Sequence, residues 1–427
     1  MTTMISNLPT VLIEEIFVRV PLKSLRAVRL TCKSWNTLSK SRSFRKLYIS
    51  KTATREEESM MIAMMNFDLY LTRVLVDDVD PSKAFKKKRK RRKKKESIAF
   101  KRKPRFLDEQ VKICQVFHCE GLLLCILKED DTRVVVWNPY LGQTRWIQLR
   151  YSHRPHGDDR FVYALGYKDK ESCGSFKLLR FIDYFRGAPK KQFFWYEIYD
   201  FNSDSWTTLD VTPHWGISCG DRGVSLKGNT YWCAKERNAE DDIVDHIICF
   251  DFTRERFGPL LPLPSSVMDH EYEIVTLSCV KEEKLAALFQ HYESDWNEFD
   301  IWITTKIDGE MVSWSMFLRM ETGPRIQVPH ICDGFFIDEE KKFAMGFEED
   351  FDRKTFIIIG EAGYVKKMDI GVHVDRKCRP SVCSYVPSLV QIKKPSRGKR
   401  KRQSSLEKRL FDQNMLRLEA FKNPDYF

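Results

Sequence analysis

The chain has 427 residues, 42% of them hydrophobic, which is enough to bury a sizeable core and to form more than one domain. Its formal net charge is +12, but two basic runs (residues 83–105 and 393–402) carry the whole excess, so the remainder is mildly acidic and a nucleic-acid groove spread over the folded body is disfavoured. The longest apolar run, Leu122 to Leu127, is too short to cross a bilayer, and no signal-peptide pattern is present, so no membrane contact is expected.

Residues 1–50 show helical periodicity. A broad apolar stripe recurs at helical spacing between two prolines, and its members are Leu12, Ile13, Ile16, Phe17 and Val20, with Pro9 before them and Pro21 after them. A second short helix is predicted over residues 25–30 and a third over residues 33–39. Three short helices make a marginal core, so this segment predicts a module that is stabilised by a partner.

The side chains of this segment also follow a known pattern. It consists of Leu8-Pro9-x-x-Leu12-x-x-Glu15-Ile16, Val20-Pro21-Leu22-Lys23-Ser24-Leu25, Val28-Arg29, Cys32-Lys33-x-Trp35-x-x-Leu38 and Phe44. This pattern resembles the F-box over residues 4 to about 47, with Thr31 where Val is commoner. The resemblance implies docking on a Skp-family adaptor, and through it on a cullin and a RING protein. The implied contact residues are Leu8, Pro9, Leu12, Ile16, Pro21, Leu25, Val28, Arg29, Cys32, Lys33, Trp35 and Leu38.

Residues 51–110 are predicted to form a flexible charged linker. An unbroken run of ten basic residues inside it cannot fold compactly. Three interpretations stay open: a nuclear localisation signal, with residues 399–402 as a second candidate, a solvated linker, and a nucleic-acid contact. Single-strand stacking is disfavoured because aromatic residues are absent from the run. The nuclear-targeting hypothesis, with a location in the nucleus, the cytoplasm or both, names Lys86, Lys87, Lys88, Arg89, Lys90, Arg91, Arg92, Lys93, Lys94 and Lys95.

Residues 111–392 repeat a pattern of short strands. Each unit has an apolar strand, a turn, a strand that ends in Asn or Asp, and a strand that carries an aromatic residue, as at Trp146, Trp206, Phe257 and Trp314. Four-stranded sheets at such a period predict a β-propeller, because no single blade can bury its apolar face alone. A β-sandwich fits less well, since the period is long and regular. Five units can be recognised, and a sixth could be assembled from residues 111–117 with residues 382–392, so the number of blades stays open.

Several phrases of this region resemble the F-box-associated domain of plant F-box proteins, which is related to Kelch-type propellers. They include Val136-Trp137-Asn138-Pro139, Tyr199-Asp200-Phe201, Phe250-Asp251-Phe252, Leu261-Pro262-Leu263-Pro264 and Phe336-Ile337-Asp338. The resemblance covers about residues 110–385 and implies that this domain captures a target protein. The tail, residues 393–427, is basic, and a helix is predicted within it.

No catalytic constellation emerges from the sequence. The nine histidines are dispersed, and there is no phosphate-binding Gly-rich loop, GxSxG elbow or HExxH motif. The twelve cysteines lack a CxxC pair, so we expect reduced, mostly buried thiols of a cytosolic or nuclear protein, with no metal and no cofactor.

The predicted fold class is an α+β multidomain chain: a small N-terminal three-helix F-box (residues 1–50), the linker, a large all-β propeller-like domain (residues 111–392) and the tail. The predicted function is that of a non-catalytic, substrate-recognition subunit of an SCF-type ubiquitin ligase with an unknown protein substrate. Two alternatives stay open. One is a Kelch-like propeller enzyme or sugar-binding protein, and the other is a basic nuclear protein that binds nucleic acid.

Overall fold

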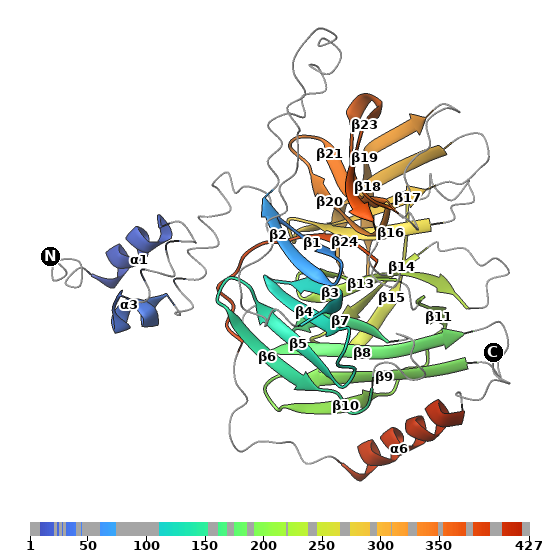
Figure 1. Ribbon diagram of the computed structural model, residues 1–427. Coiled ribbons are helices and arrows are strands. Elements are labelled where there is room, and N and C mark those ends of the chain that lie inside the picture. Colours follow the sequence, from blue (N-terminus) through green and yellow to red (C-terminus); the bar gives the residue numbers. More distant parts are fainter. Residues whose placement is uncertain are drawn as a thin grey trace, which may run out of the picture. The chain divides into compact units, whose positions relative to one another are not determined.

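The computed structural model describes residues 9–20, 24, 28, 31–39, 44, 60–73, 111–152, 161–168, 175–185, 192–218, 221–237, 246–264, 274–290, 297–308, 310–322, 331–348, 353–372, 379–392 and 404–420. The chain divides into two compact units, residues 1–59 and residues 60–427. The first contains short helices, and the second consists of strands with one C-terminal helix (Figure 1).

Two helices are described in the first unit, α1 (Thr10–Val18) and α3 (Lys33–Leu38). Helix α1 begins directly after Pro9, and Cys32 precedes α3, where its Sγ accepts the N–H of Trp35 at 3.4 Å. The first and third predicted helices are therefore present. The second lies largely outside the described residues, so the three-helix arrangement stays a prediction.

Aromatic side chains hold the two helices together. Phe17 of α1 packs edge-to-face on Trp35 of α3, with ring centroids 5.1 Å apart, and on Phe44 at 6.2 Å. Phe17 and Phe44 are buried. The core of this unit is thus a small aromatic cluster, which is consistent with the marginal stability expected for so short a segment.

Six antiparallel sheets form the second unit in the described part of the chain, and we call them blades 1–6. Blade 1 contains β3 (Ile113–Cys119), β4 (Leu122–Leu127), β5 (Arg133–Asn138) and β6 (Gln143–Gln148). Blade 2 contains β7 (Val162–Tyr167), β8 (Phe176–Phe185), β9 (Gln192–Asp200) and β10 (Ser205–Leu209). Blade 3 contains β11 (Trp215–Gly216), β12 (Val224–Leu226), β13 (Asn229–Glu236), β14 (His246–Asp251) and β15 (Arg256–Pro262). Blade 4 contains β16 (Ile274–Val280), β17 (Lys284–Gln290), β18 (Asn297–Ile307) and β19 (Val312–Thr322). Blade 5 contains β20 (Ile331–Asp338), β21 (Phe343–Glu348), β22 (Arg353–Gly360) and β23 (Tyr364–Val372), with the 3₁₀ turn η5 (Glu361–Gly363) before β23. Blade 6 contains β24 (Ser381–Ser384), β1 (Met60–Met65) and β2 (Asp68–Arg73).

The blades close into a ring. Each buried apolar cluster of the second unit lies between two consecutive blades, and the last one joins blade 6 to blade 1 through Ile62 and Met64 on one side and Leu123 and Trp137 on the other. Because the last interface returns to the first blade, the unit is a β-propeller, as the repeats predicted, and it has six blades, a number that the repeats left open (Figure 1).

Two details of the sequence prediction are wrong. Residues 60–73, which were expected in the linker, form the hairpin β1–β2, and β1 pairs with β24 from the other end of the domain. Residues 111–117, which were expected in a sixth blade, belong mainly to β3 of blade 1. The all-apolar segment Met60–Met65 is buried on both sides in blade 6. The sequence analysis assigned it to the linker because the region that contains it is highly charged.

The recurring Asn or Asp at strand ends has a structural role. The Oδ1 of Asn138 accepts the N–H groups of Tyr140 and Leu141, both at 2.9 Å, and thereby fixes the turn from β5 to β6. The equivalent turns of other blades are fixed in the same way by Asp200, Asp251 and Asp308. These side chains act as local turn formers, which explains their recurrence at this place in the repeat.

The aromatic residues of the repeat mostly connect neighbouring blades. The indole N–H of Trp206 donates to the carbonyl of Gln148 in blade 1 at 3.0 Å, and that of Trp314 donates to the carbonyl of Pro262 in blade 3 at 3.1 Å. Trp146 differs, because 42% of its surface is exposed and its face is covered by Arg133. Trp146 therefore does not connect blade 1 to a neighbouring blade as Trp206 and Trp314 connect theirs.

Helix α6 (Ser405–Ala420) lies against β9 and β10 of blade 2, and it confirms the helix that was expected in the tail. Its side chains Phe411, Met415 and Leu418 join the apolar cluster between blades 1 and 2. The C-terminal segment thus adds a covering layer to the outside of the propeller (Figure 1).

Candidate functional site

Helix α1 presents apolar side chains on two sides. Ile13 and Phe17 are buried against the rest of the first unit. Val11, Leu12 and Ile16 are 70%, 46% and 42% exposed. A nine-residue helix that is apolar on its buried and its exposed side leaves a surface suited to a partner.

The structure places part of the predicted contact set near this surface. Pro9, Leu12, Ile16 and Lys33 are exposed, and Val28, Cys32, Trp35 and Leu38 are half-buried, so all of these can be reached from outside. Leu8, Pro21, Leu25 and Arg29 lie outside the described residues. The sequence analysis did not name Val11 as a contact, although it is the most exposed apolar side chain of α1.

The two ends of the propeller differ in how its strands are joined. At one end, which we call the turn end, the innermost strand of a blade continues through a tight turn, as at residues 120–121, 227–228 and 281–283. At the other end, which we call the loop end, the chain passes from the outermost strand of one blade to the innermost strand of the next, as between β6 and β7, between β15 and β16, and between β19 and β20. Binding residues occur preferentially on loops held by a rigid scaffold, so the loop end is the candidate recognition surface.

At the turn end, Glu282 of blade 4 reaches across the propeller axis to blade 1. Its Oε1 lies 3.0 Å from Nε2 of His118, which also accepts the backbone N–H of Gly121 at 3.1 Å. Since Nε2 presents a lone pair, the contact is attractive only when the Glu282 carboxyl carries a proton. Burial raises the pKa of Glu282 well above its usual value, with a contribution from the charge of Glu120, and burial lowers the pKa of His118 to about 3. A neutral pair therefore bridges this end.

We expect Glu282→Gln to raise the free energy of unfolding at pH 8 by about 1 kcal/mol and to leave it nearly unchanged at pH 4. A carboxyl with a raised folded pKa contributes its full stability below the unfolded value of about 4.3, and this contribution is lost as the pH rises towards the folded pKa. The amide of Gln donates to His118 at every pH. The other titratable groups around this carboxyl are Glu120, Cys119, Cys279, Cys383, Tyr167 and Tyr385.

Urea titrations of both proteins between pH 4 and pH 8 check this prediction. The difference between variant and wild type should grow with pH, and a constant difference would contradict a protonated Glu282.

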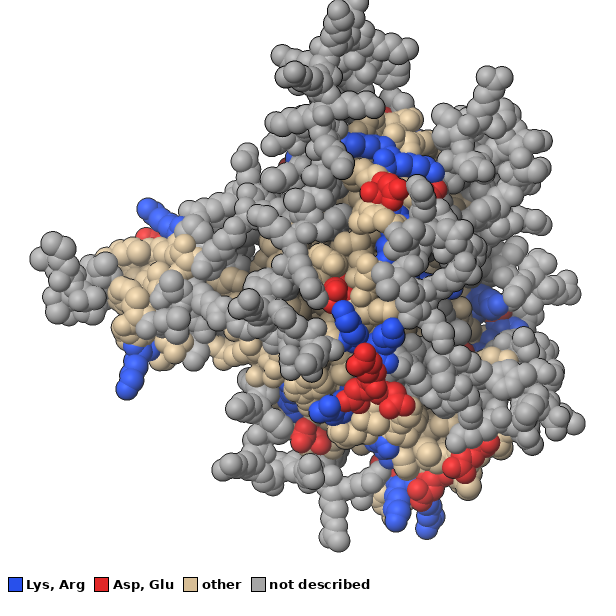
Figure 2. All heavy atoms as spheres, viewed as in Figure 1, with Lys and Arg blue, Asp and Glu red and all other residues tan. Residues whose placement is uncertain are grey.

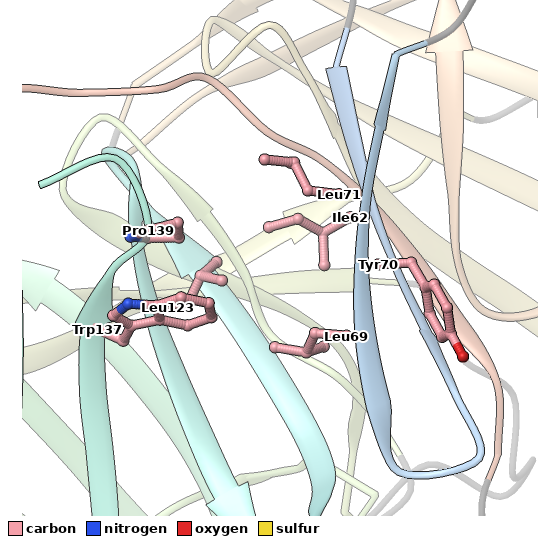
Figure 3. Close-up of a pocket in the computed structure, with 7 residues that line it drawn as sticks. All are labelled: Ile62, Leu69, Tyr70, Leu71, Leu123, Trp137 and Pro139. Atoms are coloured by element: carbon pink, nitrogen blue, oxygen red, sulfur yellow. The ribbon is translucent and has the colours of Figure 1, made fainter. Parts of the chain in front are cut away.

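A small apolar cleft lies where the ring closes, between blade 6 and blade 1. Apolar side chains of both blades point into it, whereas Tyr70 points away from the others, and its lining is Ile62, Leu69, Tyr70, Leu71, Leu123, Trp137 and Pro139 (Figure 3). The cleft has no room for a water molecule between these side chains, so we assign it to imperfect packing at the closing interface and not to a ligand site.

Within the described ranges, no group of three or more His, Cys, Asp or Glu side chains could hold a metal ion, and no helix has the length and apolar character needed to cross a membrane. Positive and negative side chains lie next to each other on the face shown in Figure 2. The basic run Lys86 to Lys95 lies outside the described residues.

Comparisons with known proteins agree with this architecture. Residues 5–47 match the F-box domain, and residues 60–392 match the F-box associated beta propeller domain. The chain is 88% identical to the F-box protein At2g38590 of Arabidopsis thaliana over 99% of both chains, and 60% identical to the F-box/kelch-repeat protein At4g33290 of the same plant over 96% of this chain and 95% of that one. Among solved structures, TolB from Acinetobacter baumannii aligns with a TM-score of 0.43 at 10% identity, over 80% of this chain and 72% of TolB.

The propeller match begins at residue 60, the first residue of β1, and so includes the hairpin that the sequence prediction had left in the linker. Helix α6 lies beyond the end of the match at residue 392. The chain belongs to the plant F-box proteins that combine an F-box with an F-box-associated β-propeller domain.

Proposed function

We propose that this protein is the substrate-recognition subunit of an SCF-type cullin–RING ubiquitin ligase. The F-box would dock on a Skp-family adaptor, which connects it to a cullin and a RING protein. The observation that carries this proposal is the two-sided apolar character of α1, in which Ile13 and Phe17 complete the core while Leu12 and Ile16 stay exposed. A partner that covers these side chains would remove apolar surface from water.

The proposed role is non-catalytic. Ubiquitin transfer would take place at the conjugating enzyme that the RING protein recruits, and this subunit would supply proximity. Holding a target near that enzyme converts a bimolecular encounter into an effectively intramolecular one, which raises the effective concentration of the target's lysines. Target capture would use the loop end of the propeller.

We expect Leu12→Ala with Ile16→Ala to weaken binding of a purified Skp-family adaptor by about 100-fold, because two interface anchors of more than about 1 kcal/mol each are lost. Isothermal titration or biolayer interferometry measures the affinity. A matched control is Met311→Ala with Met316→Ala in the other unit, which removes two exposed apolar side chains, one directly before β19 and one within it, 55% and 41% exposed.

The control should bind the adaptor like the wild type. An adaptor affinity that is unchanged in the α1 variant would overturn the docking assignment, provided that the circular dichroism spectrum shows an intact fold.

Nuclear as well as cytoplasmic location is a further part of this proposal. It rests on the ten consecutive basic residues from Lys86 to Lys95. Deleting residues 83–105 from a fluorescent fusion of the full chain should reduce nuclear accumulation. Unchanged accumulation would count against a targeting role and leave a plain linker.

A further inference from the structure

The loop end of the axis contains an ion pair between two blades that are not neighbours. Arg222 lies directly before β12 of blade 3, and Asp333 lies in β20 of blade 5. The Nε of Arg222 is 3.2 Å from Oδ1 of Asp333. The pair therefore crosses the axis at the end where the chain passes from one blade to the next.

The backbone places Asp333 in an unusual way. A β-bulge interrupts the pairing of β20 with β21 at this point, and both Asp333 and Gly334 have positive φ, 56° and 98°. A Cβ atom on Gly334 would lie 2.6 Å from the carbonyl oxygen of Val382 in blade 6, so only glycine fits there. Bulges of this kind redirect a side chain and are frequent next to functional sites.

One oxygen of Asp333 has no hydrogen-bond partner among the described residues. The side chain is 7% exposed, and its Oδ2 accepts no hydrogen bond from any of the described residues. A buried carboxylate oxygen without a donor is costly, so native proteins satisfy such atoms with protein, water or a ligand. The group that would satisfy Oδ2 must be a donor, because an ionised carboxylate only accepts.

A second carboxyl lies close by. Burial raises the pKa of Asp221 to about 6, and the negative charge of Asp333 adds to this rise. Among the described residues, Lys235 acts on Asp221 in the opposite sense and Arg222 is paired with Asp333, so both cations already have a carboxylate neighbour. An anionic ligand would bring no donor to Oδ2, whereas a cationic donor would form a charge-assisted hydrogen bond with it.

We propose that Asp333 receives a lysine or arginine side chain of the captured protein at the loop end of the propeller axis. The inference rests on the proposed function, because it assigns a residue to the capture of the target. The cationic group would donate to Oδ2, while Arg222 keeps its contact with Oδ1. The backbone of the target would lie across the loop end of the axis.

A positional-scanning peptide library, in which one position at a time is fixed to each amino acid, tests this with the full-length protein immobilised. The wild type should enrich peptides with Lys or Arg at one position. Asp333→Asn keeps the shape and the acceptor for Arg222 but places an N–H₂ group at one end of the side chain, so it should lose that preference by about tenfold or more. The matched control Glu340→Gln removes one charge from an acidic side chain that is 79% exposed at the turn end, and it should keep the preference.

A second measurement is independent of how well the variant folds. For a selected peptide, replacing its basic residue by Gln should weaken binding to the wild type by about tenfold or more. A wild-type profile without a basic preference, or one that Asp333→Asn leaves intact, overturns the inference. Adaptor binding, measured in the same preparations, tests the proposed function separately, since it depends on α1 and not on Asp333.

Discussion

Replacing Glu407 with alanine is expected to release α6 from the propeller and to lower the free energy of unfolding by about 3–5 kcal/mol. The Glu407 carboxylate accepts the backbone N–H of Thr208 at 2.9 Å and lies 2.8 Å from Nη1 of Arg150. Arg150 also lies 3.0 Å from Glu197, whose side chain is 1% exposed, and the fully buried Arg180 lies 3.9 Å from the other oxygen of Glu197. Two cations and two carboxylates balance here, so removing one carboxylate leaves buried positive charge without compensation.

The same carboxylate completes the edge of blade 2. Strand β10 pairs with β9 on one side, and the N–H of Thr208 on its other side is satisfied by Glu407 instead of by another strand. The ring of Phe411 then packs against Trp195, with centroids 5.5 Å apart, and beneath the guanidinium of Arg150 at 3.8 Å. Loss of Glu407 therefore weakens a polar and an apolar contact together, and the helix should detach as a unit.

Thermal melts and hydrogen exchange at Thr208 measure this effect. Glu419→Ala is a matched control, because it removes the same charge from an exposed position on the same helix and should change stability by less than about 0.5 kcal/mol. Glu407→Gln should fall between the two, since an amide oxygen still accepts from Thr208. If the Thr208 amide stayed protected in Glu407→Ala, the anchoring role would be refuted.

The sequence predicted the propeller because its signals are local and repeated. Asn138, Asp200 and Asp251 form turns within their own hairpins, so an Asn or Asp recurs at the same place in the sequence of these blades. The pairing of β1 with β24 has no such local sequence pattern, because it joins residues from the two ends of the domain. The apolar run Met60–Met65 is compatible with a strand, but the sequence analysis assigned it to the linker because nothing local shows which sheet it completes.

The candidate sites also differ in whether a local sequence pattern could reveal them. The exposed side of α1 was predictable, since a short apolar helix bounded by prolines shows its excess of apolar residues directly. Asp333, Glu282 and Glu407 were not, because their environments are built by contacts between distant segments. The Asp-Gly pair at residues 333–334 inside a strand pattern is the one local signal that could have indicated a bulge.

Gly166→Ala is expected to destabilise the propeller by about 3 kcal/mol or more, at the upper end of the cost of overpacking. Gly166 lies in β7 of blade 2, where a Cβ atom would stand 2.1 Å from Cδ2 of Phe252 and 2.5 Å from the carbonyl oxygen of Gly228, both in blade 3. The Phe252 ring is fully buried and packs edge-to-face on Phe250 at 4.9 Å, so it cannot move aside. The N–H of Tyr167 also donates to the carbonyl of Gly228 at 3.1 Å, so the two blades are fixed at this distance.

Gly216→Ala separates this steric effect from the general cost of changing a glycine in a strand. The nearest atom to a Cβ at Gly216 would be Cγ of Lys235 at 3.9 Å, an ordinary contact, and neither glycine has a positive φ that would strain an alanine. Alanine there should be neutral or should stabilise by up to about 1 kcal/mol, because it restricts the unfolded chain. Chemical denaturation of both variants measures the difference. Equal stabilities would mean that blades 2 and 3 can separate at little cost, which is incompatible with a ring whose every interface contributes to a continuous buried core.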